Sequence, residues 1–248
     1  MEPSASVSPH PASAGVMPAL VLRMRNSALD VPPPGDMLPL LDDVERERAG
    51  RTADSNLRAS FIAGRYLLRV LAADVLGLDA GRLTSSFTCP RCSQADGTPD
   101  HGRPGYDLDG ERLPLALSLS RSRPFILLGA LDLRSSARRM GGDVELGVGV
   151  DLEAVGRVGF DGFDDVALNP AERVSLKRLP FEQKDEARSR LWARKEALVK
   201  ALGTGFAHRN PNGVDGADSR ITDLNHVDGV DLASEGFVAA VALVAARR

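Results

Sequence analysis

Residues 145–153, with the sequence Glu-Leu-Gly-Val-Gly-Val-Asp-Leu-Glu, constrain the fold more than any other part of this chain. Apolar residues stand at every second position, so the segment is predicted to be a β-strand with one face in the core. The opposite face carries Gly147 and Gly149, followed by Asp151 and Glu153. Glycine within a strand costs stability and often marks close approach by a ligand or by another backbone. The segment therefore predicts a core strand that another group approaches closely at its glycines.

The two carboxylates on this strand are the first indication of a functional site. Adjacent carboxylates repel each other unless a cation lies between them, and Mg²⁺ is often held by one or two carboxylates together with substrate phosphates. Asp151 and Glu153 are therefore candidate ligands of a magnesium ion. For this segment alone, an ordinary solvated strand end remains the alternative.

A third carboxylate lies on the strongest predicted helix, which covers residues 182–202. Trp192, Glu196 and Lys200 recur at every fourth position and form one stripe on this helix. The order of Glu196 and Lys200 also suits an ordinary helical ion pair, which is the alternative interpretation. Lys195 points toward the apolar side, where it must extend to the surface or find an anionic partner.

Arginines are spread through the first half of the chain, and arginine clusters can hold phosphates through paired hydrogen bonds. Arg58, Arg65 and Arg69 share one face of an amphipathic helix predicted over 54–76. Arg103 lies between glycine and proline in a tight loop, and Arg121 stands between two serines. Solvated surface arginines are the common alternative.

The remaining pattern predicts an α+β fold. Strands are predicted at 113–119, 124–133, 145–153 and 236–245, and helices from about residue 40 and over 54–76, 169–179 and 182–202. The stretch 88–110 is predicted to be a loop, 31–35 a stiff connector, and 1–18 a disordered tail, because it offers too little apolar surface to offset the entropy of ordering. The apolar strands that begin near Phe125 and Phe237 resemble each other, which is a weak sign of an internal repeat.

Composition narrows the class of protein further. The chain has 248 residues, of which 43% are apolar and 26% charged, as in soluble globular proteins. A net charge of −3 does not suggest nucleic-acid binding, and no apolar run reaches the roughly 20 residues that span a bilayer. Cys89 and Cys92 have metal-ligand spacing but no second pair, so we interpret them as ordinary thiols. We expect a cytoplasmic protein that binds neither nucleic acid nor membrane.

Together these motifs resemble those of the 4′-phosphopantetheinyl transferases. Gly-Val-Asp-Leu-Glu at 149–153 and Trp-x-x-Lys-Glu-Ala-x-x-Lys at 192–200 are similar to the paired signature of that family. Gly-Arg-Pro at 102–104 resembles its Gly-Lys/Arg-Pro element. Residues 117–122 resemble its Phe-Asn-x-Ser-His-Ser element, with Arg121 in place of the usual histidine. The length and order are similar to the longer, surfactin-synthetase-activating type.

The resemblance implies two similar α+β lobes in one chain, a pseudo-dimeric fold with the active site at the lobe interface. The lobes would cover 19–133 and 134–248, and the second would carry the metal and catalytic motifs. The implied reaction moves the 4′-phosphopantetheine arm of coenzyme A to a serine of a carrier protein and releases adenosine 3′,5′-bisphosphate. It implies Mg²⁺, or Mn²⁺ in its place, as cofactor, and acyl or peptidyl carrier proteins of fatty acid, polyketide or nonribosomal peptide synthases as partners of a monomeric enzyme.

The resemblance also implies roles for individual residues. Asp151, Glu153 and Glu196 would coordinate the metal; Glu196 would help deprotonate the carrier serine, and Lys200 would neutralise or protonate the leaving phosphate. The residues implied to bind coenzyme A are Arg58, Arg65, Arg103, Ser120, Arg121, Lys195 and Lys200. Glu172, which precedes the signature helix, is a further candidate.

Two other functions use the same features. A metal-dependent phosphohydrolase of a nucleotide-like substrate would use the same carboxylates to activate water. A carrier-protein-binding module with a degenerate site would need no catalysis, although every acid of the motifs is present in this chain.

Overall fold

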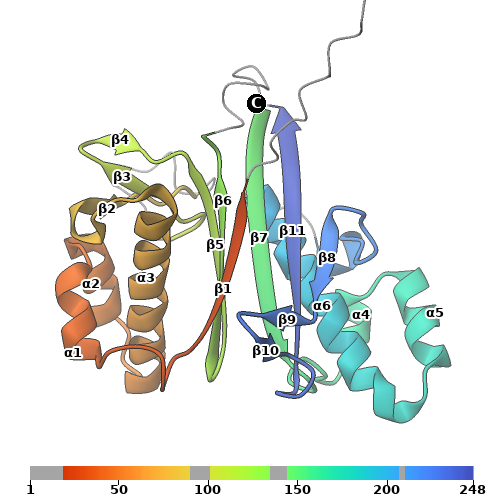
Figure 1. Cartoon of the computed structure of the whole chain (residues 1–248). Helices are drawn as coiled ribbons and strands as arrows, with labels where there is room; N and C mark the ends of the chain where they lie inside the picture. The colour runs from red at the N-terminus through yellow and green to blue at the C-terminus, as the bar shows by residue number, and fades with distance from the viewer. Residues whose placement is uncertain (1–18, 90–100, 135–143, 207–209, 248) are drawn as a thin grey trace, which may run out of the picture.

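The computed structural model describes residues 19–89, 101–134, 144–206 and 210–247. These residues form the mixed α and β structure that the sequence predicts. Two three-stranded antiparallel sheets face each other in the middle, and one long helix covers the outer face of each sheet (Figure 1). The order of layers is therefore helix, sheet, sheet, helix.

The first sheet and its helix come from the N-terminal half of the chain. The strand order is β1-β6-β5, and helix α3 packs on β5 and β6. Helix α3 begins after Asp54, whose carboxylate accepts a hydrogen bond from the Leu57 amide, and it ends at Gly77, whose φ of 70° suits glycine. The elements of this half are β1 (Leu20–Asn26), α1 (Pro34–Met37), α2 (Asp43–Gly50), α3 (Ser55–Leu76), β5 (Leu115–Ser122) and β6 (Phe125–Asp132).

The second sheet has the order β7-β11-β8, and helix α6 packs on β7 and β11. Helix α6 ends at Gly203, which adopts a φ of 71°. The elements of this half are β7 (Val144–Ala154), α4 (Phe163–Ala167), α5 (Pro170–Arg178), α6 (Lys184–Leu202), β8 (Ile221–Leu224) and β11 (Phe237–Arg247).

Smaller elements complete the described part of the chain. A three-stranded sheet contains β2 (Leu83–Ser85), β3 (Tyr106–Leu108) and β4 (Glu111–Arg112), and a short ribbon contains β9 (His226–Val227) and β10 (Val230–Asp231). Single 3₁₀ turns lie at Leu38–Leu40, Ala80–Arg82, Phe181–Gln183 and Pro211–Gly213. None of the helices in the described segments has the length and apolar character needed to cross a membrane.

The glycines of β7 face helix α6, so the close approach that they predicted is that of another backbone. A Cβ atom added to Gly149 would overlap the carbonyl oxygen of Ala197, and one added to Gly147 would overlap that of Ala201. The helix therefore lies directly on the strand. Because the neighbours of these alanines on the helix are Glu196 and Lys200, the packing brings both residues to the acidic end of the strand.

The two sheets meet along the edges of β5 and β7 without a backbone ladder between them. Instead, the hydroxyl oxygen of Ser118 accepts a hydrogen bond from the amide of Val150 at 3.0 Å, and that of Ser122 accepts one from Ala154 at 3.2 Å. The apolar face of β7 packs against the first sheet in the core between the sheets. Serine side chains thus satisfy backbone groups that a neighbouring strand would otherwise satisfy.

Most of the predicted elements are confirmed, but some predictions are wrong. Strands β1 and β8 had not been predicted, the predicted loop at 88–110 contains β3, and the predicted connector at 31–35 contains the start of α1. Strand β1 was missed because Arg23 and Arg25, which lie near Asp228, interrupt its apolar alternation. The predicted tail 1–18 lies outside the described residues.

We expect Gly149→Ala to lower the free energy of unfolding by about 1–3 kcal/mol, as overpacking typically does, because the new methyl group would collide with α6. Urea denaturation followed by the fluorescence of Trp192, the single tryptophan, would measure this change. Gly50→Ala is the matched control, because nothing lies within 4 Å of the added Cβ. Equal stability of the two variants would contradict the packing described.

Candidate active site

A pocket of about 960 Å³ lies where the two halves of the chain meet. Its walls come from β5, β7 and the C-terminal part of α6, with one residue of α3 and the loops 101–104 and 203–206. The site therefore depends on both sheets. The residues from the sequence motifs that line it are Arg65, Arg103, Ser120, Arg121, Asp151, Glu153, Glu196 and Lys200.

The acidic wall is built around Asp151, which is only 2% exposed. Its Oδ1 atom accepts hydrogen bonds from Lys200 Nζ at 2.5 Å and from Ser120 Oγ at 2.8 Å. Its Oδ2 atom is buried and has no hydrogen-bond partner among the described residues. A buried carboxylate oxygen without a donor is costly, so this atom is suited to a ligand that carries positive charge.

The carboxylates of Glu153 and Glu196 have raised pKa values, because the charge of Lys200 does not offset their burial. Burial, together with the negative charge of Asp151, raises the pKa of Glu153 to about 7, and Lys200 opposes this only partly. Burial also raises the pKa of Glu196; the charge of Lys200 opposes the shift and that of Asp151 adds to it. An additional cation at this wall would favour the ionised form of all three carboxylates.

The acids do not form a complete metal cage by themselves. Within the described ranges, no group of three or more His, Cys, Asp or Glu side chains is arranged to hold a metal ion. Carboxylate oxygens are nevertheless the preferred ligands of Mg²⁺, which commonly takes only one or two of them and completes its shell with water and phosphate. The donor set therefore fits that ion chemically, provided that further ligands come from elsewhere.

Arg121 lines the pocket from β5. Its guanidinium lies beside the Cα of Gly64 on α3 and 5.6 Å from the ring centre of Phe61. The side chain is open to solvent through the pocket although protein surrounds it. Burial and the charges of Arg65 and Arg48 lower its pKa to about 10. It still carries a positive charge at neutral pH, and an anion in the pocket would stabilise that charge.

Arg65 lines the same pocket from α3. It is 7% exposed, and its guanidinium lies 4.1 Å from the ring centre of Phe87 and 5.2 Å from that of Phe61. Arg103 also lines the pocket, where its guanidinium pairs with Glu145 and donates to the carbonyl oxygen of Ala201 at 3.2 Å. The predicted arginines thus reach the pocket from three separate segments, namely α3, the loop 101–104 and β5.

The structure does not bring Arg58 or Lys195 to the pocket, contrary to their predicted role in binding coenzyme A. Arg58 lies in the first turn of α3, and its Nε atom donates to the carbonyl oxygen of Thr52 at 2.8 Å. Lys195 is fully buried and donates to Glu172 at 2.7 Å and to the carbonyl oxygen of Ala167 at 2.7 Å. Since successive residues of a helix are about 100° apart, Lys195 and its neighbour Glu196 face different surroundings.

Glu172, also a candidate from the sequence, is fully engaged in this buried contact. Its Oε2 atom accepts from Lys195 and from the amide of Asn169 at 2.8 Å, and its Oε1 atom accepts from the amide of Gly216 at 2.9 Å. The pair joins the start of α5 to α6 and to the segment after 210. Glu172 is therefore the anionic partner that Lys195 needs in the protein interior, and the pair holds these segments together.

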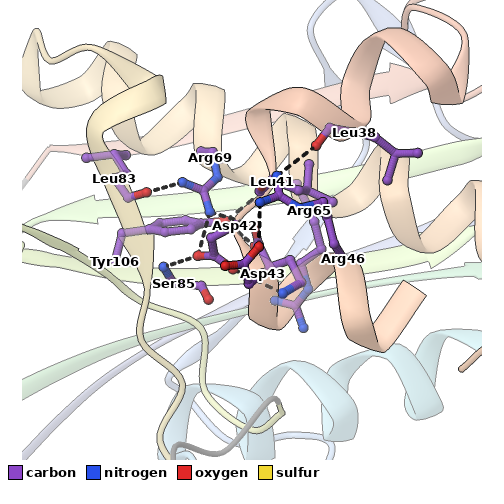
Figure 2. Close-up of polar contacts among 11 residues, drawn as sticks. Leu38, Leu41, Asp42, Asp43, Arg46, Arg65, Arg69, Leu83, Ser85 and Tyr106 are labelled. Carbon is purple, nitrogen blue, oxygen red and sulfur yellow. Dashed lines mark hydrogen bonds and ion pairs between the residues drawn. The ribbon is translucent and has the colours of Figure 1, made fainter. Parts of the chain in front are cut away.

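Arg69 also lies away from the pocket, in a buried polar cluster (Figure 2). It donates to Glu45 at 2.6 Å and to Asp42 at 2.9 Å, and it lies 4.9 Å from the ring centre of Tyr106. Asp42 in turn accepts a hydrogen bond from the amide of Ser85. The cluster fastens α2, α3 and the small sheet together and so holds the helix that carries Arg65.

Sequence reasoning missed several lining residues, among them Cys89, His101 and Phe206. The Phe206 ring stacks on Trp192, with 5.2 Å between ring centres. The sequence did contain a signal for Phe206. Trp192 shares a helical stripe with Glu196, and Phe206 directly follows the glycines that end the helix. Cys92 lies outside the described residues, so the interpretation of the two cysteines as ordinary thiols stays a prediction.

Comparison with known proteins finds a family similar to the part of the chain that carries the carboxylates. Residues 147–231 match the family described as the 4′-phosphopantetheinyl transferase superfamily. The matched residues include the acidic strand and the helix that carries Glu196, so this part of the chain is similar to that superfamily. The predicted resemblance is confirmed.

A particular relative agrees with this assignment. The chain is 30% identical over 176 residues to the 4′-phosphopantetheinyl transferase HetI of Nostoc sp. (strain PCC 7120). The alignment covers 69% of this chain and 63% of that relative, so the chain spans less than two thirds of the relative's length.

We expect Lys195→Met to lower the free energy of unfolding by about 3–5 kcal/mol, because it leaves the Glu172 carboxylate buried without its cation. Urea denaturation would measure the change. Lys177→Met, on the exposed side of α5, is the control and should stay within about 0.5 kcal/mol of the wild type. A stable Lys195→Met variant with weakened coenzyme A binding would instead support the role that the resemblance implied.

Proposed function

We propose that this protein is a 4′-phosphopantetheinyl transferase. It transfers the 4′-phosphopantetheine arm of coenzyme A to a serine hydroxyl of an acyl or peptidyl carrier protein and releases adenosine 3′,5′-bisphosphate. The observation that carries this proposal is one pocket that is lined both by three carboxylates of the family-matched segment and by arginines of the N-terminal half. Its volume, about 960 Å³, suits a large ligand such as a coenzyme.

The chemistry needs charge neutralisation and positioning more than a covalent intermediate. Attack of a hydroxyl on a pyrophosphate concentrates negative charge on both bridging phosphates. Arg65, Arg103 and Arg121 supply positive charge in the pocket, and its lining residues would orient the reacting groups. The serine proton must also be removed. Glu196, whose pKa burial raises, is suited to accept it.

We propose that Asp151, Glu153 and Glu196 hold Mg²⁺, and that Mn²⁺ can take its place. The unpartnered Oδ2 atom of Asp151 and the raised pKa of both glutamates support this assignment. Phosphate oxygens of coenzyme A would complete the ligand shell. When bound, the ion would neutralise developing charge on the pyrophosphate.

Lys200 has a separate role in this proposal. Its ammonium donates to Asp151 at 2.5 Å and to the carbonyl oxygen of Val150 at 3.3 Å, so it is held at the acidic wall. From there it would neutralise or protonate the leaving phosphate. All proposed groups belong to one chain, so a monomer would suffice.

We further propose that the chain consists of two similar lobes, 19–133 and 134–248, that arose by duplication. In the main three-stranded sheet of each half, the first strand in the chain pairs with the last, the last also pairs with the middle one, and a long helix covers the outer face. The resembling apolar strands, β6 and β11, hold the same central position. Their first residues, Phe125 and Phe237, contact each other with 5.4 Å between ring centres.

The test of the proposed reaction is an intact-mass assay with purified protein, Mg²⁺, coenzyme A and an apo carrier protein. The carrier should gain the mass of the phosphopantetheine arm. Asp151→Asn should abolish this gain while circular dichroism stays unchanged, and Asp161→Asn, at an exposed loop position, should retain it. Nucleotide release without carrier modification would favour a phosphohydrolase, and carrier binding without turnover a degenerate binding module.

A second test concerns Arg121, which stands where relatives of this type have histidine. Arg121→Ala should raise the coenzyme A concentration at half-maximal rate by about 10- to 100-fold, the value of a charged hydrogen bond, and lower the maximal rate less. With Arg121→His this concentration should rise between pH 6 and pH 8, because imidazole loses its charge there, whereas the wild type should stay constant. The control is Arg123→Ala, an exposed neighbour. An unchanged requirement in Arg121→Ala would make Arg121 a surface charge only.

A further inference from the structure

We propose that Ser120 is a positioning residue for Asp151, and that the N-terminal half in this way completes the metal site of the C-terminal half. The family resemblance implied contact with coenzyme A for this serine instead. The inference rests on the proposed function and deepens it, because it concerns how the magnesium ligand is oriented.

The contact joins two different sheets. Ser120 is on β5 and Asp151 on β7, and the serine Oγ donates to the Asp151 Oδ1 atom at 2.8 Å. Both residues are buried, at 8% and 2% exposure. Rotation about the last bond of an aspartate side chain is otherwise only weakly restricted, so this hydrogen bond decides where the two oxygens point.

The two donors to Asp151 share one oxygen. Lys200 Nζ donates to the same Oδ1 atom at 2.5 Å, and Oδ2 has no partner among the residues that the structure describes. Ser120 and Lys200 approach from different elements and both line the pocket with Asp151. Together they hold one oxygen in place and leave the other available to an ion.

The neighbouring serines of β5 show that this contact is particular to Ser120. Ser118 and Ser122 lie on the same side of the strand, but their hydroxyls accept hydrogen bonds from the backbone amides of Val150 and Ala154. These two serines therefore hydrogen-bond to the backbone of β7 and not to the Asp151 carboxylate. Ser122, which does not line the pocket, is therefore a matched control for the loss of one hydroxyl at the same seam.

The experiment measures metal binding directly, without turnover. Mn²⁺ is titrated into protein saturated with coenzyme A, in the absence of carrier protein, and free Mn²⁺ is followed by electron paramagnetic resonance. Ser120→Ala should weaken Mn²⁺ binding about 10- to 100-fold, as loss of a hydrogen bond to a metal ligand typically does. Ser120→Thr, which keeps the hydroxyl, should restore most of the affinity, and Ser122→Ala should bind as the wild type does.

A second measurement separates this role from contact with coenzyme A. Calorimetric titration of coenzyme A in the presence of EDTA should give the same affinity for Ser120→Ala and for the wild type. The inference is overturned if Ser120→Ala binds Mn²⁺ as tightly as the wild type, or if it loses affinity for coenzyme A without metal while Mn²⁺ binding is unchanged.

Asp151→Asn distinguishes failure of this inference from failure of the proposed function. Strong Mn²⁺ binding by the wild type and weak binding by Asp151→Asn would establish the metal site, whatever Ser120 does. Equal binding by those two proteins would remove Asp151 from the metal site, and the role of Ser120 would fall with it.

Discussion

The contact between the backbone of α6 and the backbone of β7 is the constraint on which the rest of the site depends. It requires glycine at positions 147 and 149, since a methyl group at either would overlap a carbonyl oxygen of the helix. Because helix and strand touch at this point, Glu196 and Lys200 come to lie beside Asp151 and Glu153, although the two segments are far apart in the chain. The glycines and the carboxylates of β7 therefore act together. Gly147 and Gly149 allow α6 to approach the strand, and Asp151 and Glu153 then lie beside Glu196 and Lys200 of that helix.

The two halves of the chain meet through side chains as well as through apolar packing. Serine hydroxyls of β5 accept hydrogen bonds from the edge of β7, and Arg121, next to the last residue of the same strand, lines the pocket. Lys200 lies among the three carboxylates, and arginines line other parts of the pocket. Burial and like charges raise the pKa of Glu153 on one side and lower that of Arg121 on the other. A metal ion with an anionic phosphate ligand would relieve both, and this is the physical basis of the proposed function.

The signature helix serves two purposes on two of its faces. Glu196 and Lys200 face the pocket, whereas Lys195 is buried against Glu172 and the start of α5. A charged residue within a functional motif thus need not contact the ligand. Lys195 instead fixes the helix against the segments that follow and precede it, so the orientation of Glu196 depends on an ion pair outside the pocket.

Much of this protein could be predicted from sequence alone, because the deciding patterns are local. Alternation along β7, helical spacing in α3 and α6, and glycines at helix ends depend on residues close in the chain. Each of the two motifs that carry Asp151, Glu153 and Glu196 is likewise a short local pattern. Only the tertiary structure decided what each polar side chain meets. Arg58, Arg69 and Lys195 lie away from the pocket, Ser120 reaches Asp151, and β1 pairs with β6 despite its arginines. Those contacts depend on which distant segment packs against which face of a helix or strand. The spacing of apolar residues along the sequence does not identify that segment.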